Sequence, residues 1–335
     1  MRTAEYDFSL PAGLIAARPA KERDSSRLLV LHKDGDVEHR RFSDLSSYLV
    51  PGDLLVLNNT KVFPARITAR KPTGGKVEFL LVTKNPDGSW DVLSRQYYTG
   101  ELAIAGQFFA HMTGGRTVRF HDGTDLQMII WKHGQMPLPP YIRREPDEDD
   151  KQRYQTVYAV AEGSIAAPTA GIHFTHELLD TIRKRSVQVH MVTLHVGTGT
   201  FRPVKADRIE DHIMDVEHFE IPTTVIAEIE AAKKSGRRVI TVGTTTTRAL
   251  EGYFSGRSSC RQVKGKVTGS TDIFIHEGYR FMAADVLITN FHLPQSTPLM
   301  LTAAFAGREK LLHAYQEAIS GGYRFFSYGD AMLVL

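Results

Sequence analysis

In the second half of the chain, short apolar runs alternate with segments of helical period, and this alternation constrains the fold more than any other feature. Runs at residues 187–196, 238–242 and 285–289 predict buried strands. Thr175 is the expected N-cap of one intervening helix, and residues 297–320 predict one long helix before a last strand at 324–327. The alternation over residues 155–335 predicts an α/β fold with a largely parallel sheet covered on both faces.

The first part of the chain has a different character. Residues 27–57 predict mixed α/β structure, with a hairpin turn at Asp34-Gly35 and a buried strand at 53–57. Residues 64–135 predict a small β-barrel or sandwich, because short strand-like runs are separated by glycine-containing turns. These runs lie at 76–82, 90–93 and 126–131. A proline-rich segment at 137–140 and an acidic run at 145–150 form the expected linker.

Composition limits the possibilities without choosing a function. A chain of 335 residues suggests roughly two domains, and 42% hydrophobic residues can build a sizeable core. Lys and Arg total 41 against 38 Asp and Glu, a formal charge of +3, so an RNA-binding surface must be a local basic patch. Cys260 is the only cysteine, and there is no export signal or apolar run long enough for a membrane. We therefore expect a cytoplasmic protein.

Common catalytic motifs are missing from the sequence. It contains no phosphate-binding P-loop, complete G-x-G-x-x-G, G-x-S-x-G elbow or H-E-x-x-H helix. His173 and His176 are spaced to share a helical face, but no further ligands stand at metal-binding spacing, and we predict no metal.

Four polar clusters follow apolar runs or precede helices, where functional loops often lie. Each also has a plain structural explanation as a turn, a helix approach or a core histidine, so they carry weight only together. Their notable members are Asn58, Asn59 and Thr60 with Arg66; Thr169, Gly171 and His173; His195 with Gly197; and Asn290 with His292.

One local pattern occurs twice. Residues 196–202 and 242–248 both read V-G-T-x-T-x-R, and each follows an apolar run. Both segments should lie at carboxyl ends of strands, where open α/β sheets bind ligands. They could face one ligand, or be two ordinary turns.

Together these blocks resemble the S-adenosylmethionine:tRNA ribosyltransferase-isomerase family of queuosine biosynthesis. The resemblance covers nearly the whole chain. Its blocks are long and follow one another in the family's order, so together they are more specific than a short motif. The blocks are residues 14–16, 22–30, 51–62, 139–142, 154–158, 167–174, 193–203, 242–250, 271–275, 289–294, 304–309 and 325–332.

The resemblance implies a fold and a reaction. The family fold is an α/β domain built from both chain ends, here residues 1–63 and 150–335, with a β-barrel inserted at 64–149. The reaction moves the ribosyl part of S-adenosylmethionine to 7-aminomethyl-7-deazaguanine in the anticodon loop of tRNA. Isomerisation gives epoxyqueuosine-tRNA, and adenine and methionine leave. The implied partners are this tRNA and S-adenosylmethionine as co-substrate, with no membrane, and we expect a monomer.

Such chemistry needs a base near the 5′ carbon beside the sulfonium and an acid at the departing adenine. Histidine suits both tasks near neutral pH. We predict His173 and His195 as the leading acid/base residues, with His292 behind them. Arg248 could bind the methionine carboxylate or pair with a structural acid. The predicted substrate-binding residues are Asn58, Asn59, Thr60, Arg66, Thr169, Gly171, Gly197, Thr200, Thr244, Thr245, Arg248, Asp272 and Asn290.

Three segments depart from the family pattern: residues 94–98 (Ser94 to Tyr98), Asp215 where histidine is frequent, and His276-Glu277 in place of a proline-glycine turn. Two other functions stay open. A tRNA methyltransferase using S-adenosylmethionine would show a glycine-rich first loop, which is absent. A non-catalytic RNA-binding module would show an aromatic surface or strong basic bias, and neither is clear.

Overall fold

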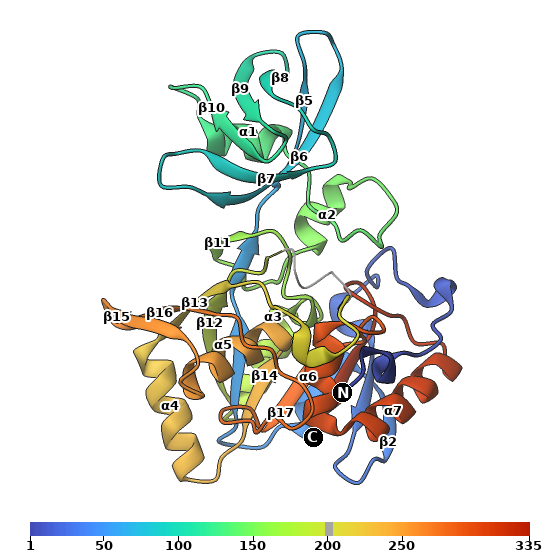
Figure 1. Cartoon of the computed structure of the whole chain (residues 1–335). Coiled ribbons are helices and arrows are strands. Elements are labelled where there is room, and N and C mark those ends of the chain that lie inside the picture. The colour runs from blue at the N-terminus through green and yellow to red at the C-terminus, as the bar shows by residue number, and fades with distance from the viewer. Residues whose placement is uncertain (198–203) are drawn as a thin grey trace.

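The computed structural model describes residues 1–197 and 204–335. Within them the chain forms two bodies, a large α/β part and a smaller β-barrel that stands above it in Figure 1. A parallel strand pair, β4 (Thr60–Val62) and β11 (Ala161–Ser164), lies between the two bodies. None of the described helices has the length and apolar character needed to cross a membrane.

The α/β part is built on a ten-stranded sheet of order β15-β16-β13-β12-β3-β14-β17-β18-β1-β2. Its four central strands are mutually parallel, and antiparallel strands flank them. The central strands are β12 (Gln188–Leu194), β3 (Leu54–Asn58), β14 (Val239–Val242) and β17 (Val286–Asn290). The others are β1 (Arg27–Leu31), β2 (Val37–Arg41), β13 (Glu217–Pro222), β15 (Ser259–Val263), β16 (Lys266–Thr271) and β18 (Ala331–Val334). The predicted α/β fold is confirmed, with the parallel pairing concentrated at its centre.

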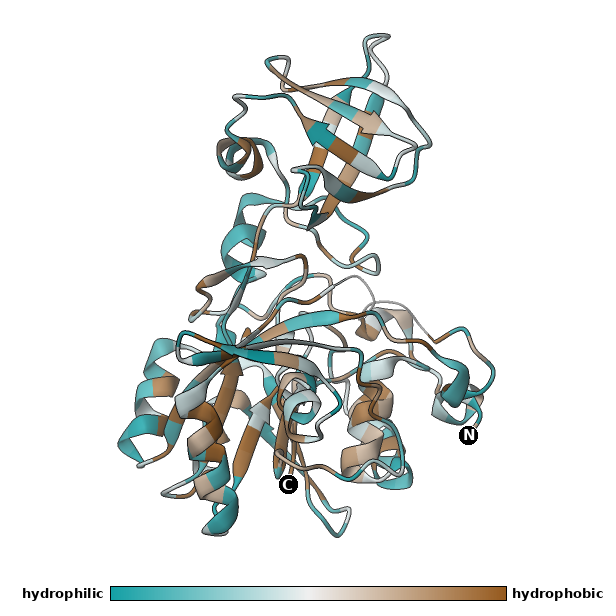
Figure 2. Cartoon of the chain, turned by 60° about the vertical axis from the view of Figure 1, so that its left-hand side comes forward, coloured by the Kyte–Doolittle hydropathy of each residue, from teal (hydrophilic) through white to brown (hydrophobic). Residues whose placement is uncertain are grey.

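Alternation along β3 shows how the sheet is buried on both faces. Leu55 and Leu57 pack with the apolar side chains of α3 (His176–Lys184), whereas Leu54 and Val56 pack under α4 (Thr223–Lys234). Successive side chains of a strand point to opposite faces, so a strand covered on both sides is apolar throughout. Figure 2 shows the hydrophobic colour concentrated on these central strands. Thr175 caps α3 as predicted, since its side chain accepts a hydrogen bond from the Leu178 amide.

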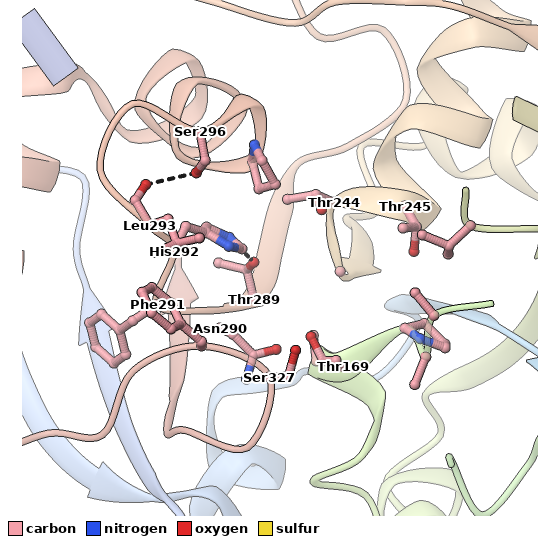
Figure 3. A pocket seen from close by; sticks show the side chains of 18 of the residues that line it. Thr169, Thr244, Thr245, Thr289, Asn290, Phe291, His292, Leu293, Ser296 and Ser327 are labelled. Carbon is pink, nitrogen blue, oxygen red and sulfur yellow. Dashed lines mark hydrogen bonds between the residues drawn. The ribbon is translucent and has the colours of Figure 1, made fainter. Parts of the chain in front are cut away.

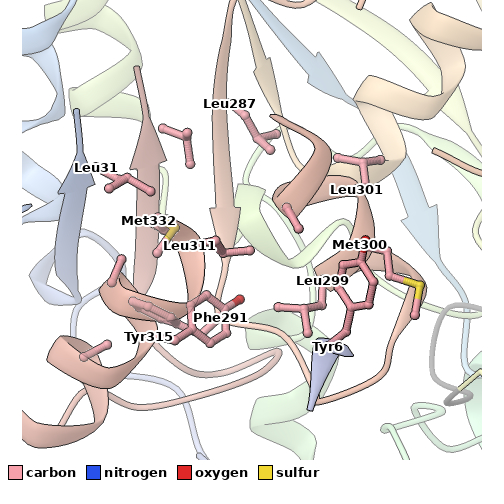
Figure 4. Close-up of a cluster of buried hydrophobic side chains, with 14 of the residues drawn as sticks. Tyr6, Leu31, Leu287, Phe291, Leu299, Met300, Leu301, Leu311, Tyr315 and Met332 are labelled. Carbon is pink, nitrogen blue, oxygen red and sulfur yellow. The ribbon is translucent and has the colours of Figure 1, made fainter. Parts of the chain in front are cut away.

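A third apolar cluster lies on the side of the sheet covered by the C-terminal helices (Figure 4). The predicted single helix over 297–320 is wrong, because α6 (Thr297–Ala306) and α7 (Arg308–Ser320) are separated at Gly307, whose φ is 88°. Only glycine adopts such an angle without strain, so this residue lets the chain change direction. The last strand is β18 rather than residues 324–327, since the chain first makes a turn stabilised by Asp330.

The barrel is closed, with strand order β10-β7-β6-β5-β8-β9, and its neighbouring strands pair antiparallel. Ile67, Phe79 and Met112 are among the buried side chains that fill it. Its strands are β5 (Arg66–Arg70), β6 (Lys76–Lys84), β7 (Trp90–Ser94), β8 (Gly100–Ile104), β9 (Phe108–Thr113) and β10 (Thr117–Phe120).

Two segments beside the barrel differ from the prediction. Residues 126–131, predicted as a strand, lie in helix α1 (Leu126–His133), which Asp125 caps by accepting from the Met128 amide. The acidic run predicted as linker enters helix α2 (Glu148–Arg153), where Asp147 is the cap. A short apolar run such as 126–131 does not distinguish a strand from a buried helix. In both segments a capping aspartate begins the helix.

Candidate active site

A pocket lies at the carboxyl ends of β14 and β17 (Figure 3), the edge where parallel sheets bind ligands. The segment at 166–170 forms another wall. Of the predicted residues, Thr169, Thr244, Thr245, Asn290 and His292 line it. Its remaining lining residues are Tyr141, Ala166, Ala167, Pro168, Ala170, Val196, Gly243, Thr289, Phe291, Leu293, Ser296, Pro298, Phe326 and Ser327.

The threonines reach the pocket because a tight turn joins β14 to helix α5 (Thr244–Phe254). Gly243 in this turn has a φ of 87°, and α5 starts directly after it. The first residues of α5, Thr244 and Thr245, therefore border the pocket together with the amide end of the helix. Helix N-termini favour anionic or hydrogen-bond-accepting groups, which makes this wall suited to a polar ligand.

Asn58 does not line the pocket but holds its frame together. Its amide nitrogen donates to the Leu194 carbonyl at 2.9 Å and to Thr245 Oγ1 at 3.3 Å. Its Oδ1 accepts from the amides of Thr60 and Leu194, each at 3.1 Å. One buried side chain thus joins β3, β12 and the start of α5.

His292 is the predicted histidine that lines the pocket. Its Nε2 shares a hydrogen bond with Thr289 Oγ1 at 2.8 Å, and its backbone amide donates to the Tyr315 hydroxyl at 2.9 Å. Burial lowers the pKa of His292 to about 3, so the ring is neutral near pH 7. Phe291, one residue earlier, is anchored in the apolar cluster of Figure 4, with its ring centre 5.3 Å from that of Tyr315.

Asn290 connects the pocket to His173. Asn290 is 3% exposed and donates through Nδ2 to His173 Nε2 at 3.1 Å and to the Asp330 carbonyl at 3.4 Å. The other ring nitrogen of His173 lies 2.7 Å from Ser26 Oγ. Burial lowers the pKa of His173 to about 4. His173 borders a separate, smaller hollow with Arg23 and Ser26 rather than the main pocket.

His195 lies elsewhere. Its Nδ1 is 2.9 Å from Thr60 Oγ1, and a Cβ at Gly163 would come within 2.8 Å of its ring, so a glycine is needed there. Its ring borders an open surface hollow with His218 and Glu220 on the antiparallel side of the sheet. Burial lowers the pKa of His195. The three predicted histidines therefore do not share one pocket.

Arg248 pairs with a residue that the sequence analysis did not single out. Its guanidinium forms an ion pair with Glu217, and both side chains are buried at 8% and 4% exposure. Its Nε donates to the Ile273 carbonyl at 3.2 Å, and Glu217 also accepts from the Gly197 amide at 3.2 Å. Within the described residues, Arg248 Nη2 has no partner. Glu217 is 31 residues from Arg248 in sequence, so no local sequence pattern predicts that the two pair.

The other predicted residues make structural contacts or lie away from the pocket. Asn59 accepts from Thr193 Oγ1 at 2.7 Å, and a Cβ at Gly171 would meet the Tyr158 hydroxyl at 2.1 Å. Arg66 forms an ion pair with Glu78 in the barrel, and Asp272 is exposed, as is Asp215. Thr200 lies outside the described residues.

Tyr141 and Ser327 contribute hydroxyl groups to the pocket that were not predicted. The Tyr141 hydroxyl and Ser327 Oγ are hydrogen bonded to each other, and the Ser327 amide donates to Tyr141 at 3.2 Å. Burial raises the pKa of Tyr141 to about 12, which keeps this hydroxyl protonated. Both residues lie in blocks that carried the family resemblance, at 139–142 and 325–332, and that was the available signal.

Known proteins resemble the chain along its full length. The family model described as "Queuosine biosynthesis protein" matches residues 3–334. Proteins named S-adenosylmethionine:tRNA ribosyltransferase-isomerase from Thermodesulfovibrio yellowstonii and Halothermothrix orenii are 52% and 48% identical, each covering 100% of both chains. The crystal structure of S-adenosylmethionine tRNA ribosyltransferase from Thermotoga maritima is 36% identical, with a TM-score of 0.57, covering 99% of this chain and 100% of that one.

Proposed function

The chain belongs to the S-adenosylmethionine:tRNA ribosyltransferase-isomerase family of queuosine biosynthesis proteins, as a transferase/isomerase, and on that premise we propose its substrates and products. The enzyme transfers the ribosyl moiety of S-adenosylmethionine to 7-aminomethyl-7-deazaguanine in the anticodon loop of tRNA. It isomerises the ribose and yields epoxyqueuosine-tRNA, adenine and methionine. The observation that carries this proposal is the full-length match to relatives of that name.

The pocket supports the proposal by the chemistry of its lining. A sulfonium makes the neighbouring 5′ carbon acidic, and removal of its proton needs a base shielded from water. His292 lines this pocket and has one ring nitrogen held by Thr289, and it is the proton acceptor that we propose. Thr244 and Thr245 at the start of α5, with Asn290, supply polar groups for intermediates in a buried setting.

We place the tRNA contact on the inserted segment 64–149. The turn after β7 exposes Tyr97 to 86%, and the exposed Arg95 and Arg116 lie on this turn and the adjoining one. The Gly115 amide donates to the Tyr98 carbonyl at 2.8 Å, which fastens the two turns together. Within the described residues neither arginine forms an ion pair. An exposed ring beside two free guanidinium groups suits an unpaired base and its phosphates.

The test is a reaction with purified full-length protein. S-adenosylmethionine and tRNA carrying 7-aminomethyl-7-deazaguanine are incubated with it, and small molecules and digested nucleosides are analysed by mass spectrometry. Free adenine, free methionine and an epoxyqueuosine nucleoside are expected. A methylated nucleoside with S-adenosylhomocysteine would instead identify a methyltransferase, and binding of tRNA without donor consumption would refute catalysis on this substrate.

A further inference from the structure

Asn290 has one polar atom that the fold leaves unused. Its Oδ1 is buried and has no hydrogen-bond partner among the described residues, although Asn290 is only 3% exposed. Figure 3 shows this oxygen turned toward Ser327 and Thr169, which also line the pocket. A buried carbonyl without a hydrogen-bond partner is destabilising, because it has lost its water. Such an atom at a pocket wall indicates a ligand that donates a hydrogen bond to it.

The orientation of this amide is determined by its neighbours. The Asp330 backbone carbonyl can only accept, so the Asn290 atom 3.4 Å from it must be the NH2 group. The same NH2 group faces His173 Nε2 at 3.1 Å, which must then be the unprotonated ring nitrogen. The amide oxygen is consequently the atom left for the pocket.

The rest of the network agrees with this assignment. With Nε2 unprotonated, the neutral ring carries its proton on Nδ1, which donates to Ser26 Oγ at 2.7 Å. The Ser26 hydroxyl in turn donates to the Arg23 carbonyl at 3.3 Å. The network ends in a backbone carbonyl on each side, so its donors and acceptors can be arranged in only one way. Burial keeps His173 neutral by lowering its pKa to about 4.

Asp330 makes the far end of this network rigid. Its carboxylate accepts from the backbone amides of Arg27 at 3.0 Å and Arg324 at 2.9 Å. The ring of Phe42 lies against the His173 ring, with centres 5.0 Å apart. His173 therefore has both nitrogens engaged and little freedom to rotate toward a reacting atom.

We propose that His173 is a positioning residue, which holds the Asn290 amide so that Oδ1 accepts a hydrogen bond from an N–H or O–H group of S-adenosylmethionine. This inference rests on the proposed function and replaces the acid/base role expected for His173. The exocyclic amine of adenine and the ribose hydroxyls are the neutral donors of that ligand. Calorimetric titration with adenosine and inosine distinguishes them, because only adenosine carries the amine.

The test uses two amide substitutions at His173 in the full-length protein. In His173→Gln the amide lies near the position of Nε2 and can accept from Asn290, whereas in His173→Asn it lies near Nδ1 and leaves Asn290 without an acceptor. We expect His173→Gln to bind S-adenosylmethionine within ~3-fold of wild type and His173→Asn to bind ~3–10-fold more weakly. At saturating donor, both should keep turnover within ~10-fold of wild type, since no proton transfer is lost.

Asn290→Leu completes the comparison. It removes the acceptor and should weaken S-adenosylmethionine binding as His173→Asn does, with the double variant no weaker than the more affected single variant. Thr302→Val is the control for loss of a buried hydroxyl, because Thr302 donates only within α6, to the Pro298 carbonyl at 2.9 Å. Melting temperatures of all variants identify losses that come from misfolding.

Several results would overturn the inference. These are equal binding by the two His173 variants, strictly additive effects with Asn290→Leu, or a ~10²–10⁴-fold loss of turnover at saturating donor in His173→Gln, which would restore a proton-transfer role. The wild-type assay separates the two proposals. If wild type produces no adenine, the proposed function fails; if it is active while these variants contradict the pattern, only the role of His173 and Asn290 fails.

Discussion

The pocket edge of the sheet and the surface of the barrel use polar residues in opposite ways. At the pocket edge, Asn58, Asn290 and Thr245 are buried and hydrogen bonded to partners far away in the chain. On the barrel, polar pairs such as Arg119 with Asp87 have side chains that are more than half exposed. Figure 1 shows the two regions as separate bodies.

The difference in burial suits the two regions to different functions. Buried polar groups act in a setting of low dielectric, where each hydrogen bond is stronger and each unpaired atom is costly. Exposed charges are weakened by water and salt, but they meet a large polyanion without prior desolvation. We therefore expect substitutions at the pocket edge to affect chemistry or folding, and substitutions on the barrel to affect tRNA affinity.

The largest effect is expected at His292. His292→Gln should reduce turnover by ~10²–10⁴-fold if this ring accepts a proton in the reaction. Release of adenine from S-adenosylmethionine with precursor tRNA measures it. His190→Gln is a matched control on β12, since His190 is half-buried and lies outside the pocket. Turnover near the wild-type value in His292→Gln would remove proton transfer from its role.

The next effect concerns the buried pair of Arg248 and Glu217. Arg248→Met leaves the Glu217 charge buried without its partner and should destabilise the protein by ~3–5 kcal/mol. Denaturant unfolding measures this loss. The double variant Arg248→Met/Glu217→Leu should recover much of the stability, because the unpaired charge is gone. If the double variant is stable but binds S-adenosylmethionine poorly, Arg248 also contacts the methionine carboxylate.

Acid should weaken the α/β part through its buried histidines. Burial lowers the pKa of His173 to about 4 and of His292 to about 3, against an ordinary value of 6.5. Both rings take up protons more readily when unfolded, so their contribution to stability is complete above pH 6.5 and is lost as the pH falls. Each should contribute a slope of about 1.4 kcal/mol per pH unit below 6.5.

Unfolding followed by urea from pH 7 down to pH 4.5 measures this slope. For His173 the neighbouring charges are Asp330, which favours protonation, and Arg324 and Arg23, which oppose it. A smaller slope in His173→Gln than in wild type is expected. Identical slopes in the two proteins would show that His173 does not take part in the acid response.

The smallest effect is expected on the barrel. Tyr97→Ala should raise the KM for tRNA by ~5–150-fold, equivalent to the ~1–3 kcal/mol of one stacked base, and leave the KM for S-adenosylmethionine unchanged. Phe109→Ala is the control, since Phe109 is 47% exposed but lies beside His121 rather than free arginines. Equal effects of the two substitutions would argue against a specific contact at Tyr97.

The strands of the sheet could be predicted because their signal is local. Residues 54–58 and 239–242 are largely apolar runs of strand length, and burial on both faces requires that composition. The helix capped by Thr175 could be predicted for the same reason, because its cap and apolar positions are close in sequence. The helix break at Gly307 and the helical state of residues 126–131 were missed, since an isolated glycine or a short apolar run is compatible with two conformations.

The family, the α/β framework with its inserted barrel, and the polar segments after the strands could all be predicted from the order of the residues. Which of those segments meet depends on how the chain folds. The tertiary structure separates His195 from His292 and connects His173 to Asn290 across 117 residues of sequence. Apolar periodicity depends on residues that are neighbours in sequence, so it can be recognised locally. A hydrogen-bond partner depends on the order of the strands in the sheet, which brings distant residues together.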